Sequence, residues 1–361
     1  MRSSRCDHQG SKPLRGACSN PALAVCIKVT LINFTVTLSG LEDQLLGLVV
    51  REERPQLEQQ KDELIVALAN DAKLLNDLEE QILKLLSASE GNILDDDHLV
   101  ETLSNSKVTA RTIGERVVVA EATQKEINAA RASYLPAASR GSLLYFVIAD
   151  LAALDPMYQF SLNYFANLFL LAVQQAERAS ELEARLAHIM SHATLVVFDN
   201  VSRGLFEAHK ATFAFLVASA ILRAAQQVSD DEWMTLLLGA GPTGAEKAPY
   251  GTPPPALGLE PQQWQLIGHL EESFDIFAGL SSHMRGFEKD SKLWEAWQKG
   301  ATPWLSPPPG RWGEALTGGE MPPFAMLLLT KAMRPDLLLG AMQHLVATSL
   351  GRRFAELPPL N

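Results

Sequence analysis

PQLEQQKDELIVALANDAKLLNDLEEQILKLLSASE, residues 55–90, carries the most regular apolar pattern in the chain. Alternate steps of four and three residues from Leu57 to Leu85 reach an apolar side chain at seven of nine positions. This spacing is typical of a coiled-coil seam, and the intervening Glu, Gln, Lys and Ala favour a helix. The predicted seam of this first helix is Leu57, Leu64, Leu68, Leu75, Leu78, Ile82 and Leu85, with Lys61 and Asp71 at the two polar positions.

A second series with the same period reaches an apolar residue at eight of eleven positions between Leu99 and Tyr134, and Pro136 ends it. Two seams of similar length joined by a short polar connection can bury their stripes against each other only by folding back antiparallel. At 1.5 Å per residue, an arm of roughly thirty residues reaches on the order of 45 Å. The second helix contributes the predicted seam residues Leu99, Leu103, Ile113, Val117 and Ile127.

The polar connection between the two helices forms the predicted tip of this hairpin, which spans residues 55–136. Gly91 and Asn92 suit a left-handed helix end, and the aspartates that follow can cap the second helix. The predicted tip residues are Glu90, Gly91, Asn92, Asp95, Asp96 and Asp97.

Residues 28–54 are predicted to contain one strand followed by the start of a helix. KVTLINFTVT, residues 28–37, alternates β-branched or aromatic residues with polar ones, which is typical of a strand. No second strong strand pattern appears later, so the sheet that would pair with it is missing and its open edge would invite aggregation. Residues 1–27 are polar and aperiodic and are predicted to be a disordered lead-in.

The remainder is predicted to be helical, which makes the fold class mainly α. Residues 137–240 form packed helices. Asp155 and Pro156 suit a helix start, and Ser229 with Glu232 forms a capping box. Pro/Gly-rich linkers at 241–260 and 306–323 separate a helical block at 261–305 from a C-terminal helical block at 324–361. The predicted apolar face after Pro156 consists of Met157, Phe160, Tyr164, Phe165, Leu168 and Phe169, and the aromatic residues of the middle block are Trp264, Phe274, Phe277, Trp294 and Trp297.

Composition narrows the classes of partner. The chain has 42 acidic and 31 basic residues and a net charge of -11, so nucleic acid and anionic membrane surfaces are disfavoured. No apolar run reaches the roughly 18 to 20 residues that span a bilayer. The three cysteines, Cys6, Cys18 and Cys26, have neither CxxC spacing nor a nearby histidine at zinc-finger spacing. They predict reduced thiols. The basic amino terminus is not followed by a clean apolar h-region with a small-residue cleavage site, so a cytosolic compartment is predicted.

The motifs of catalysis are incomplete. GAGPTG, residues 239–244, has the GxxxxG spacing of a phosphate loop, but Ala245 and Glu246 stand where Lys and Ser or Thr would hold phosphate and magnesium. His188 and His192 lie four residues apart, without a third metal ligand, and are better explained as exposed residues of a helix. No GxSxG motif occurs. We therefore predict no catalytic, cofactor-binding or metal-binding residue in this chain.

Three segments of the sequence closely resemble dynein heavy chains. They are GLEDQLLGLVVREERPQLE at 40–58, SEGNILDDDHLVETLSNSK at 89–107 and RGSLLYFVIADLAALDPMYQFSLNYF at 140–165. Looser resemblance continues through GLFEAHKATFAFLVASAILR at 204–223 and AMRPDLLLGAMQHLVATSLGRRFAELPP at 332–359. These segments follow one another in the same order as in the family, and the sequence of the second segment resembles the axonemal type.

The resemblance implies a segment that runs from the end of the fifth AAA+ module, through the buttress coiled coil and a helical lid-like region, toward the sixth module. It implies that the arm touches the stalk coiled coil, which we expect at the tip, and transmits ATP-driven ring motions to microtubule binding. In the whole family ATP and Mg are cofactors. The implied partners are the rest of a heavy chain, intermediate and light chains, and microtubules, in the cytoplasm, cytoskeleton and ciliary axoneme.

The sequence is also compatible with other functions and origins of this chain. The phosphate loop of the fifth module and the sheet of the sixth are not in this sequence, so no ATP hydrolysis is expected from this chain alone. The first 26 residues are unlike the family, which suggests a truncated product, an alternative transcript or a partial gene model. The chain could also be a stand-alone coiled-coil interaction or scaffold protein without motor activity, or an inert fragment, and periodicity by itself is compatible with any long helical hairpin.

Overall fold

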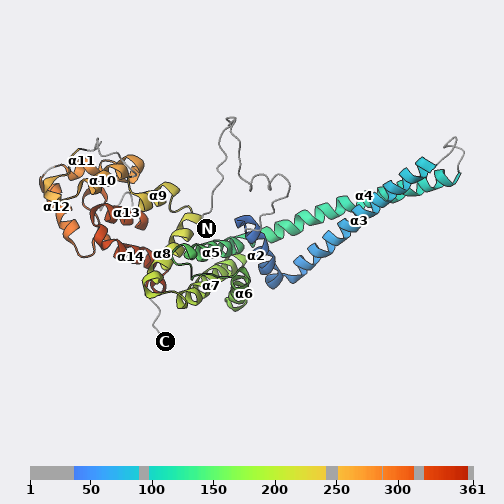
Figure 1. Ribbon diagram of the computed structural model, residues 1–361, viewed down its shortest axis with the longest axis horizontal. Coiled ribbons are helices and arrows are strands. Elements are labelled where there is room, and N and C mark those ends of the chain that lie inside the picture. Colours follow the sequence, from blue (N-terminus) through green and yellow to red (C-terminus); the bar gives the residue numbers. More distant parts are fainter. Residues whose placement is uncertain (1–35, 89–96, 241–250, 287, 313–320, 357–361) are drawn as a thin grey trace, which may run out of the picture.

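The computed structural model describes residues 36–88, 97–240, 251–286, 288–312 and 321–356, and helices are the regular elements of this part of the chain. Figure 1 shows an arm of two long helices that extends from one side of a helical body. No strand occurs among the described residues. The mainly α fold class expected from the sequence is therefore confirmed.

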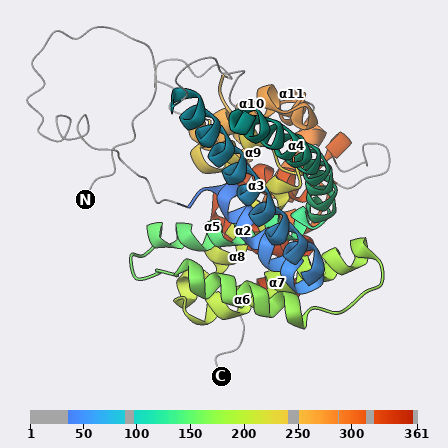
Figure 2. The ribbon, with the colours of Figure 1, turned by 90° about the vertical axis from the view of Figure 1, so that its right-hand side faces the viewer.

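The arm consists of α3 (Pro55–Ala88) and α4 (Asp97–Ala132). These helices have 34 and 36 residues, which corresponds to a length of about 50 Å. They lie side by side and pack against each other (Figures 1 and 2). Figure 1 shows no other described helix beside the outer part of the arm, and Figure 2 looks along the arm toward the body.

Two helices hold the arm in the body. α2 (Leu38–Glu53) precedes α3, with Arg54 as the single non-helical residue between them. α5 (Leu135–Asp150) follows α4 after a short turn that contains the buried Tyr134. α2 and α5 pack closely, because Gly141 leaves room for Leu45 of α2 and Phe169 of α6. The buried face of α2 consists of Leu41, Leu45, Leu46, Val49 and Val50.

The strand predicted for residues 28–37 lies almost entirely outside the described residues. Its last two positions, Val36 and Thr37, are not in a strand. Thr37 instead caps α2, because its hydroxyl accepts a hydrogen bond from the backbone N–H of Gly40 at 3.2 Å.

Three further helices complete the half of the body next to the arm, α6 (Leu162–Gln175), α7 (Leu182–Arg203) and α8 (Glu207–Ala224). The helix start predicted at Asp155 and Pro156 was wrong. Asp155 accepts a hydrogen bond from the N–H of Met157 in a turn, and Ser161 caps α6 through the N–H of Tyr164. Of the predicted apolar face, Phe165 and Phe169 are buried, Phe160 and Leu168 are half-buried, and Met157 and Tyr164 are exposed.

The far half of the body is built from shorter helices. They are α9 (Asp230–Leu238), α10 (Pro261–Ser273), α11 (Leu280–Met284), α12 (Glu288–Lys299), α13 (Pro323–Met333) and α14 (Leu338–Ser349), while the short α15 (Arg352–Ala355) packs back on α7 and α8. The capping box predicted for Ser229 and Glu232 is present at the start of α9. α14 returns to pack on α8, so the two halves share one buried core. Short 3-10 turns lie between helices throughout the body. They are Leu151–Ala153 after α5, and Pro255–Leu257, Asp275–Phe277, Pro303–Leu305, Gly310–Trp312 and Pro335–Leu337 in the far half.

The aromatic residues of the middle block pack as expected. Trp264, Phe277, Trp294 and Trp297 are buried, and Phe274 is half-buried against them. Trp294 donates a hydrogen bond to Nδ1 of His283 at 3.0 Å, and Trp297 donates to the carbonyl of Ser306 at 3.1 Å. Because both indole N–H groups have partners within the protein, this cluster is explained as core.

Candidate functional site: the helical arm and its root

The two predicted seams lie on the facing sides of α3 and α4. Every seam position whose side chain the structure describes is buried or half-buried, whereas most positions between them are exposed. Ile113 and Ile127 are the most deeply buried, at 2% and 4% exposure. The half-buried seam residues are Leu57, Leu64, Leu68, Leu75, Leu78, Ile82 and Val117. The side chains of Leu85, Leu99 and Leu103 lie outside the described residues, as does the predicted tip at 90–96, while Asp97 is described only as the first residue of α4.

The seam also contains an ion pair that the sequence did not reveal. Asp71 occupies a seam position on α3 and is 7% exposed. Its Oδ1 lies 3.2 Å from Nη2 of Arg116, which reaches across from α4. In the sequence, Asp71 only interrupts the apolar series, and Arg116 lies beside the second series rather than in it. The carboxylate at a seam position is the one feature of the sequence that indicates this ion pair, because a buried carboxylate requires a cation nearby.

A second ion pair joins α3 and α4 close to the body. Oε2 of Glu58 lies 3.0 Å from Nε of Arg131, and both side chains are largely buried. This contact is ionic rather than a well-aligned hydrogen bond. Lys61 adds a weaker contact to Glu58 at 3.7 Å. Gly47 of α2 faces this pair, and a Cβ at this position would lie 3.5 Å from Oε1 of Glu58 and 4.0 Å from Nη2 of Arg131. From the inner ion pair to the outer one, the residue number rises along α3 from Glu58 to Asp71 and falls along α4 from Arg131 to Arg116. The two helices therefore run antiparallel.

Arg185 ties the root of the arm to the body. This residue of α7 is 3% exposed. Its guanidinium donates to both carboxylate oxygens of Glu53, at 2.6 and 3.3 Å, where α2 ends just before the arm. It also donates to three carbonyls at the end of α6, those of Val173, Ala176 and Glu177. The fork of a guanidinium is suited to such simultaneous contacts.

Other contacts at the root are weaker. Arg178 approaches Glu53 at 3.7 Å, but its side chain is 65% exposed. Gln174 of α6 donates a hydrogen bond to Glu52 at 3.0 Å. These contacts, and the burial of Tyr134 in the turn after α4, place both ends of the arm against the body.

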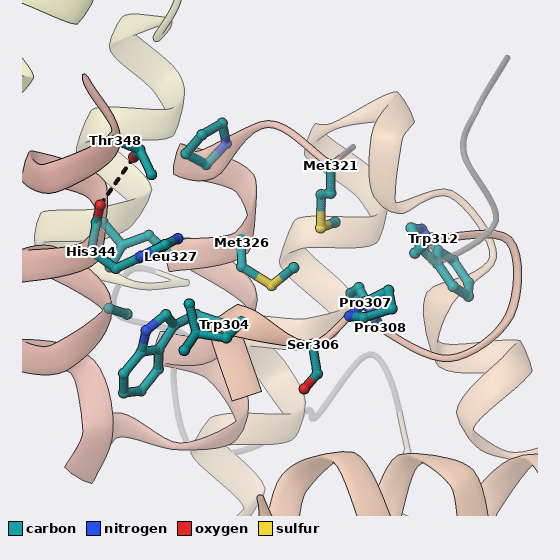
Figure 3. A pocket seen from close by; sticks show the side chains of 13 residues that line it. Trp304, Ser306, Pro307, Pro308, Trp312, Met321, Met326, Leu327, His344 and Thr348 are labelled. Carbon is teal, nitrogen blue, oxygen red and sulfur yellow. Dashed lines mark hydrogen bonds between the residues drawn. The ribbon is translucent and has the colours of Figure 1, made fainter. Parts of the chain in front are cut away.

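A cavity of about 450 Å³ lies far from the arm, between the segment at 304–308 and helices α13 and α14 (Figure 3). Trp304, Met326 and His344 line it, and Thr348 donates a hydrogen bond to the carbonyl of His344 (Figure 3). His344 is the one ionisable side chain among the described residues that line it. A single imidazole does not form the acid–base pair that most hydrolytic reactions use.

The remaining sequence motifs give no second site. His188 and His192 lie on α7 and are half-buried rather than exposed, and Nδ1 of His188 contacts the carbonyl of Glu177 at 3.2 Å. Gly239 ends α9 with a positive φ of 70°, and residues 241–250 lie outside the described part. Among the described residues, no group of three or more His, Cys, Asp or Glu could hold a metal ion. No helix of the described ranges combines the length and apolarity of a membrane span.

Comparison with known proteins relates the arm to a large family. Residues 17–113 match the model of the ATP-binding dynein motor region, a match that includes α2, α3 and the outer part of α4. Dynein axonemal heavy chain 6 of Homo sapiens is 38% identical over 93% of this chain and 8% of its own length. Dynein axonemal heavy chain 1 of Homo sapiens is 40% identical over 92% of this chain and 8% of its own length.

A similar protein is also found in an alga. The dynein-1-beta heavy chain of the flagellar inner arm I1 complex of Chlamydomonas reinhardtii is 36% identical over 93% of this chain and 7% of its own length. The chain thus spans 7–8% of the length of these curated relatives. Similarity over nearly the whole of this chain, arm and body together, identifies it as a segment belonging to the dynein heavy chain family.

Proposed function

We propose that this segment serves as the buttress of an axonemal dynein heavy chain, a stiff arm that couples motions of the ATP-driven ring to the microtubule-binding stalk. The observation that carries the proposal is the root: the buried Arg185 joins the last residue of α2 to the end of α6 through five hydrogen bonds. A device that transmits displacement needs a stiff lever and a stiff attachment. The long paired helices α3 and α4 are suited to be the lever, and the root is suited to be the attachment.

In this proposal the arm carries motion of the body outward and enlarges it. The arm leaves the body at one end (Figure 1), so a small rotation at the root becomes a larger displacement some 50 Å away. The outer end of the arm then presses on whatever coil lies beside it. In this proposal that coil is the stalk of the same heavy chain, and the contact is made by the predicted tip.

The proposal assigns ATP and Mg binding to modules outside this segment. No lysine or arginine lines the described cavity, and Ala245 and Glu246 follow the GAGPTG sequence where Lys and Ser or Thr would hold phosphate and magnesium. The implied assembly includes the rest of the heavy chain, intermediate and light chains and microtubules. The implied location is the cytoskeleton of the ciliary axoneme, because the relatives are named as axonemal or flagellar chains.

A chimeric motor tests the proposal. Residues 36–356 of this chain replace the matching segment of human dynein axonemal heavy chain 6, and ATP hydrolysis is measured with and without microtubules. We expect the chimera to keep its stimulation by microtubules. A second chimera, in which a short Gly-Ser linker replaces residues 71–117, removes the outer arm from both helices at one level and leaves Glu58, Arg131 and the root in place. We expect this shortened arm to keep basal hydrolysis and to lose stimulation.

A matched control separates loss of the arm from loss of fold. Val118→Ala changes an exposed side chain of α4 and should leave microtubule stimulation unchanged. Circular dichroism of each isolated segment checks that the helical body is intact. If the shortened chimera is stimulated by microtubules as strongly as the full chimera, the buttress proposal is wrong.

A further inference from the structure

The arm contains two cross-helix ion pairs at different levels, and together they mark one antiparallel register. Glu58 pairs with Arg131 near the body, and Asp71 pairs with Arg116 farther out. Carrying this register along the seams places Leu68 level with Ala120, and these two residues line the same groove between α3 and α4.

The apolar seam by itself does not select this register. Its pattern repeats every seven residues, so sliding α4 along α3 by one heptad again places seam residues opposite seam residues. Coiled coils resolve such ambiguity with polar groups that are satisfied in only one alignment. The two carboxylates of α3 are candidates for this role, because both are largely buried.

A slide of one heptad separates Asp71 from its cation. The positions one heptad to either side of Arg116 are Thr109 and Thr123. Each of these hydroxyls already donates to a backbone carbonyl four residues earlier, at 2.9 Å for Thr109 and 3.0 Å for Thr123. Neither carries a positive charge, so in both slipped registers the position that Arg116 occupies would offer Asp71 no ion pair. A buried unpaired carboxylate is strongly unfavourable.

Glu58 also loses its cross-helix partner after a slide of one heptad. One heptad toward the tip from Arg131 stands Gln124, which is uncharged. One heptad in the other direction stands Ala138, which is already buried in the body on α5. No heptad slide therefore keeps an arginine at the position opposite Glu58. Both cross-helix ion pairs are lost together, and Glu58 keeps only its 3.7 Å contact with Lys61 on the same helix.

We propose that Glu58–Arg131 and Asp71–Arg116 form a register lock, which holds α3 and α4 in one alignment so that the arm moves as a single body. The purpose of the lock rests on the proposed buttress function, because a lever whose helices slid past each other would absorb displacement instead of transmitting it. The existence of the lock does not depend on that function. Its test reads helix register alone and involves neither ATP nor microtubules.

Engineered disulfides measure the register. In the full chain with Cys6, Cys18 and Cys26 replaced by Ser, Ala120→Cys is combined in turn with Leu68→Cys, Lys61→Cys or Leu75→Cys. The first pair is level in the observed register, and the other two are level after a slide of one heptad in either direction. Each protein is equilibrated in a glutathione redox buffer, and the disulfide fraction is measured by mass spectrometry. With the lock intact, we expect the disulfide from Leu68→Cys alone.

The same three pairs are then placed in a variant without the lock, in which Glu58, Asp71, Arg116 and Arg131 are all replaced by Leu. Replacing whole ion pairs by apolar residues keeps the seam buried. We expect the ratio of slipped to native disulfide to rise by on the order of a hundredfold, since a broken buried pair is strongly destabilising. The charge-swapped variant Asp71→Arg with Arg116→Asp should retain the native disulfide.

Three outcomes would overturn the proposal. They are slipped disulfides in the chain with the intact lock, an unchanged native disulfide in the variant without it, and a charge-swapped variant that slips as much as the variant without the lock. If the fourfold variant loses its helical content, Arg116→Asp gives the same comparison from one half-exposed position. It sets two like charges opposite each other and should raise the slipped fraction, and an unchanged fraction would also overturn the proposal.

Discussion

The arm and the body bury their apolar residues in different ways. Each arm helix buries a single stripe against one partner, and the side chains between the stripes are mostly exposed. The body helices are buried by several neighbours at once, with Phe165, Phe169 and Phe213 at 0–1% exposure. A defect in the body can therefore be shared among many contacts, whereas a defect in the arm is local. The few polar contacts at the root and in the seam carry correspondingly more of the arm's geometry.

The largest effect is expected where the two regions meet. Arg185→Met removes the guanidinium that bonds Glu53 and three carbonyls, and the carboxylate is left buried without its main partner. We expect a loss of about 3–5 kcal/mol in the free energy of unfolding, measured by urea denaturation. Arg178→Met is the matched control, because this arginine is exposed and lies 3.7 Å from the same carboxylate. It should change stability by less than about 1 kcal/mol, and equal effects of the two substitutions would contradict this account of the root.

The next effect separates the seam of the arm from its sides. Ile113→Ala opens a hole at a position with 2% exposure and should lower the free energy of opening α4 by about 2–5 kcal/mol. Val118→Ala, at 67% exposure, should change it by no more than about 0.5 kcal/mol. Amide hydrogen exchange in α4 reports this opening separately from the body. Similar protection in the two variants would mean that the seam does not hold the arm together.

Replacing one glycine of the body and one glycine of the arm by alanine should change stability in opposite directions. A methyl group at Gly141 would lie 2.8–2.9 Å from atoms of Leu45 and Phe169, so Gly141→Ala should destabilise the body by about 1–3 kcal/mol. At Gly114 no atom other than those of the adjacent residues and the nearby helix backbone lies within 4 Å of the same position. Gly114→Ala should stabilise the arm by about 0.5–1 kcal/mol, because alanine is the better helix former. Thermal unfolding and hydrogen exchange check the two signs, and the same sign for both would refute this explanation of the two glycines.

The smallest effect concerns pH and the body alone. Lys331 of α13 donates to the carbonyls of Thr235 and Leu236 at the end of α9, and burial lowers the pKa of its amine below the usual 10.5. Between that lowered value and 10.5 the unfolded chain binds more protons, so this group makes stability rise with pH. Lys331→Met should remove that rise. Urea denaturation of both proteins across this range gives the difference, and identical pH slopes would contradict the assignment.

Local patterns in the sequence predict a large part of this structure. The alternating spacing after Pro55 indicates which side of α3 is buried, because a helix places every third or fourth residue on one side. The capping box at Ser229 needs only residues three apart. The start of α6 was misplaced because Asp155 and Pro156 form an equally good turn, and Ser161 captures the N–H of Tyr164 instead.

Contacts between residues far apart in sequence could not be predicted in this way. Arg185 and Glu53 are separated by 132 positions, and neither has an unusual local setting in the sequence. Arg116 lies outside the apolar series, so its role depends on which residue of α3 stands opposite. The root and the register of the arm are therefore properties of the folded chain, although each of their residues is ordinary in the sequence.

The central claim is that the arm is a stiff lever fixed to the body at its root. Pulsed electron paramagnetic resonance tests it directly, with spin labels at Leu83→Cys on the outer part of α3 and at Ser191→Cys on α7, both exposed positions, in a chain with its three native cysteines replaced by Ser. The account predicts a single narrow distance distribution that broadens clearly in the Arg185→Met variant. A broad distribution in the unmodified arm, or one that Arg185→Met leaves unchanged, would contradict it.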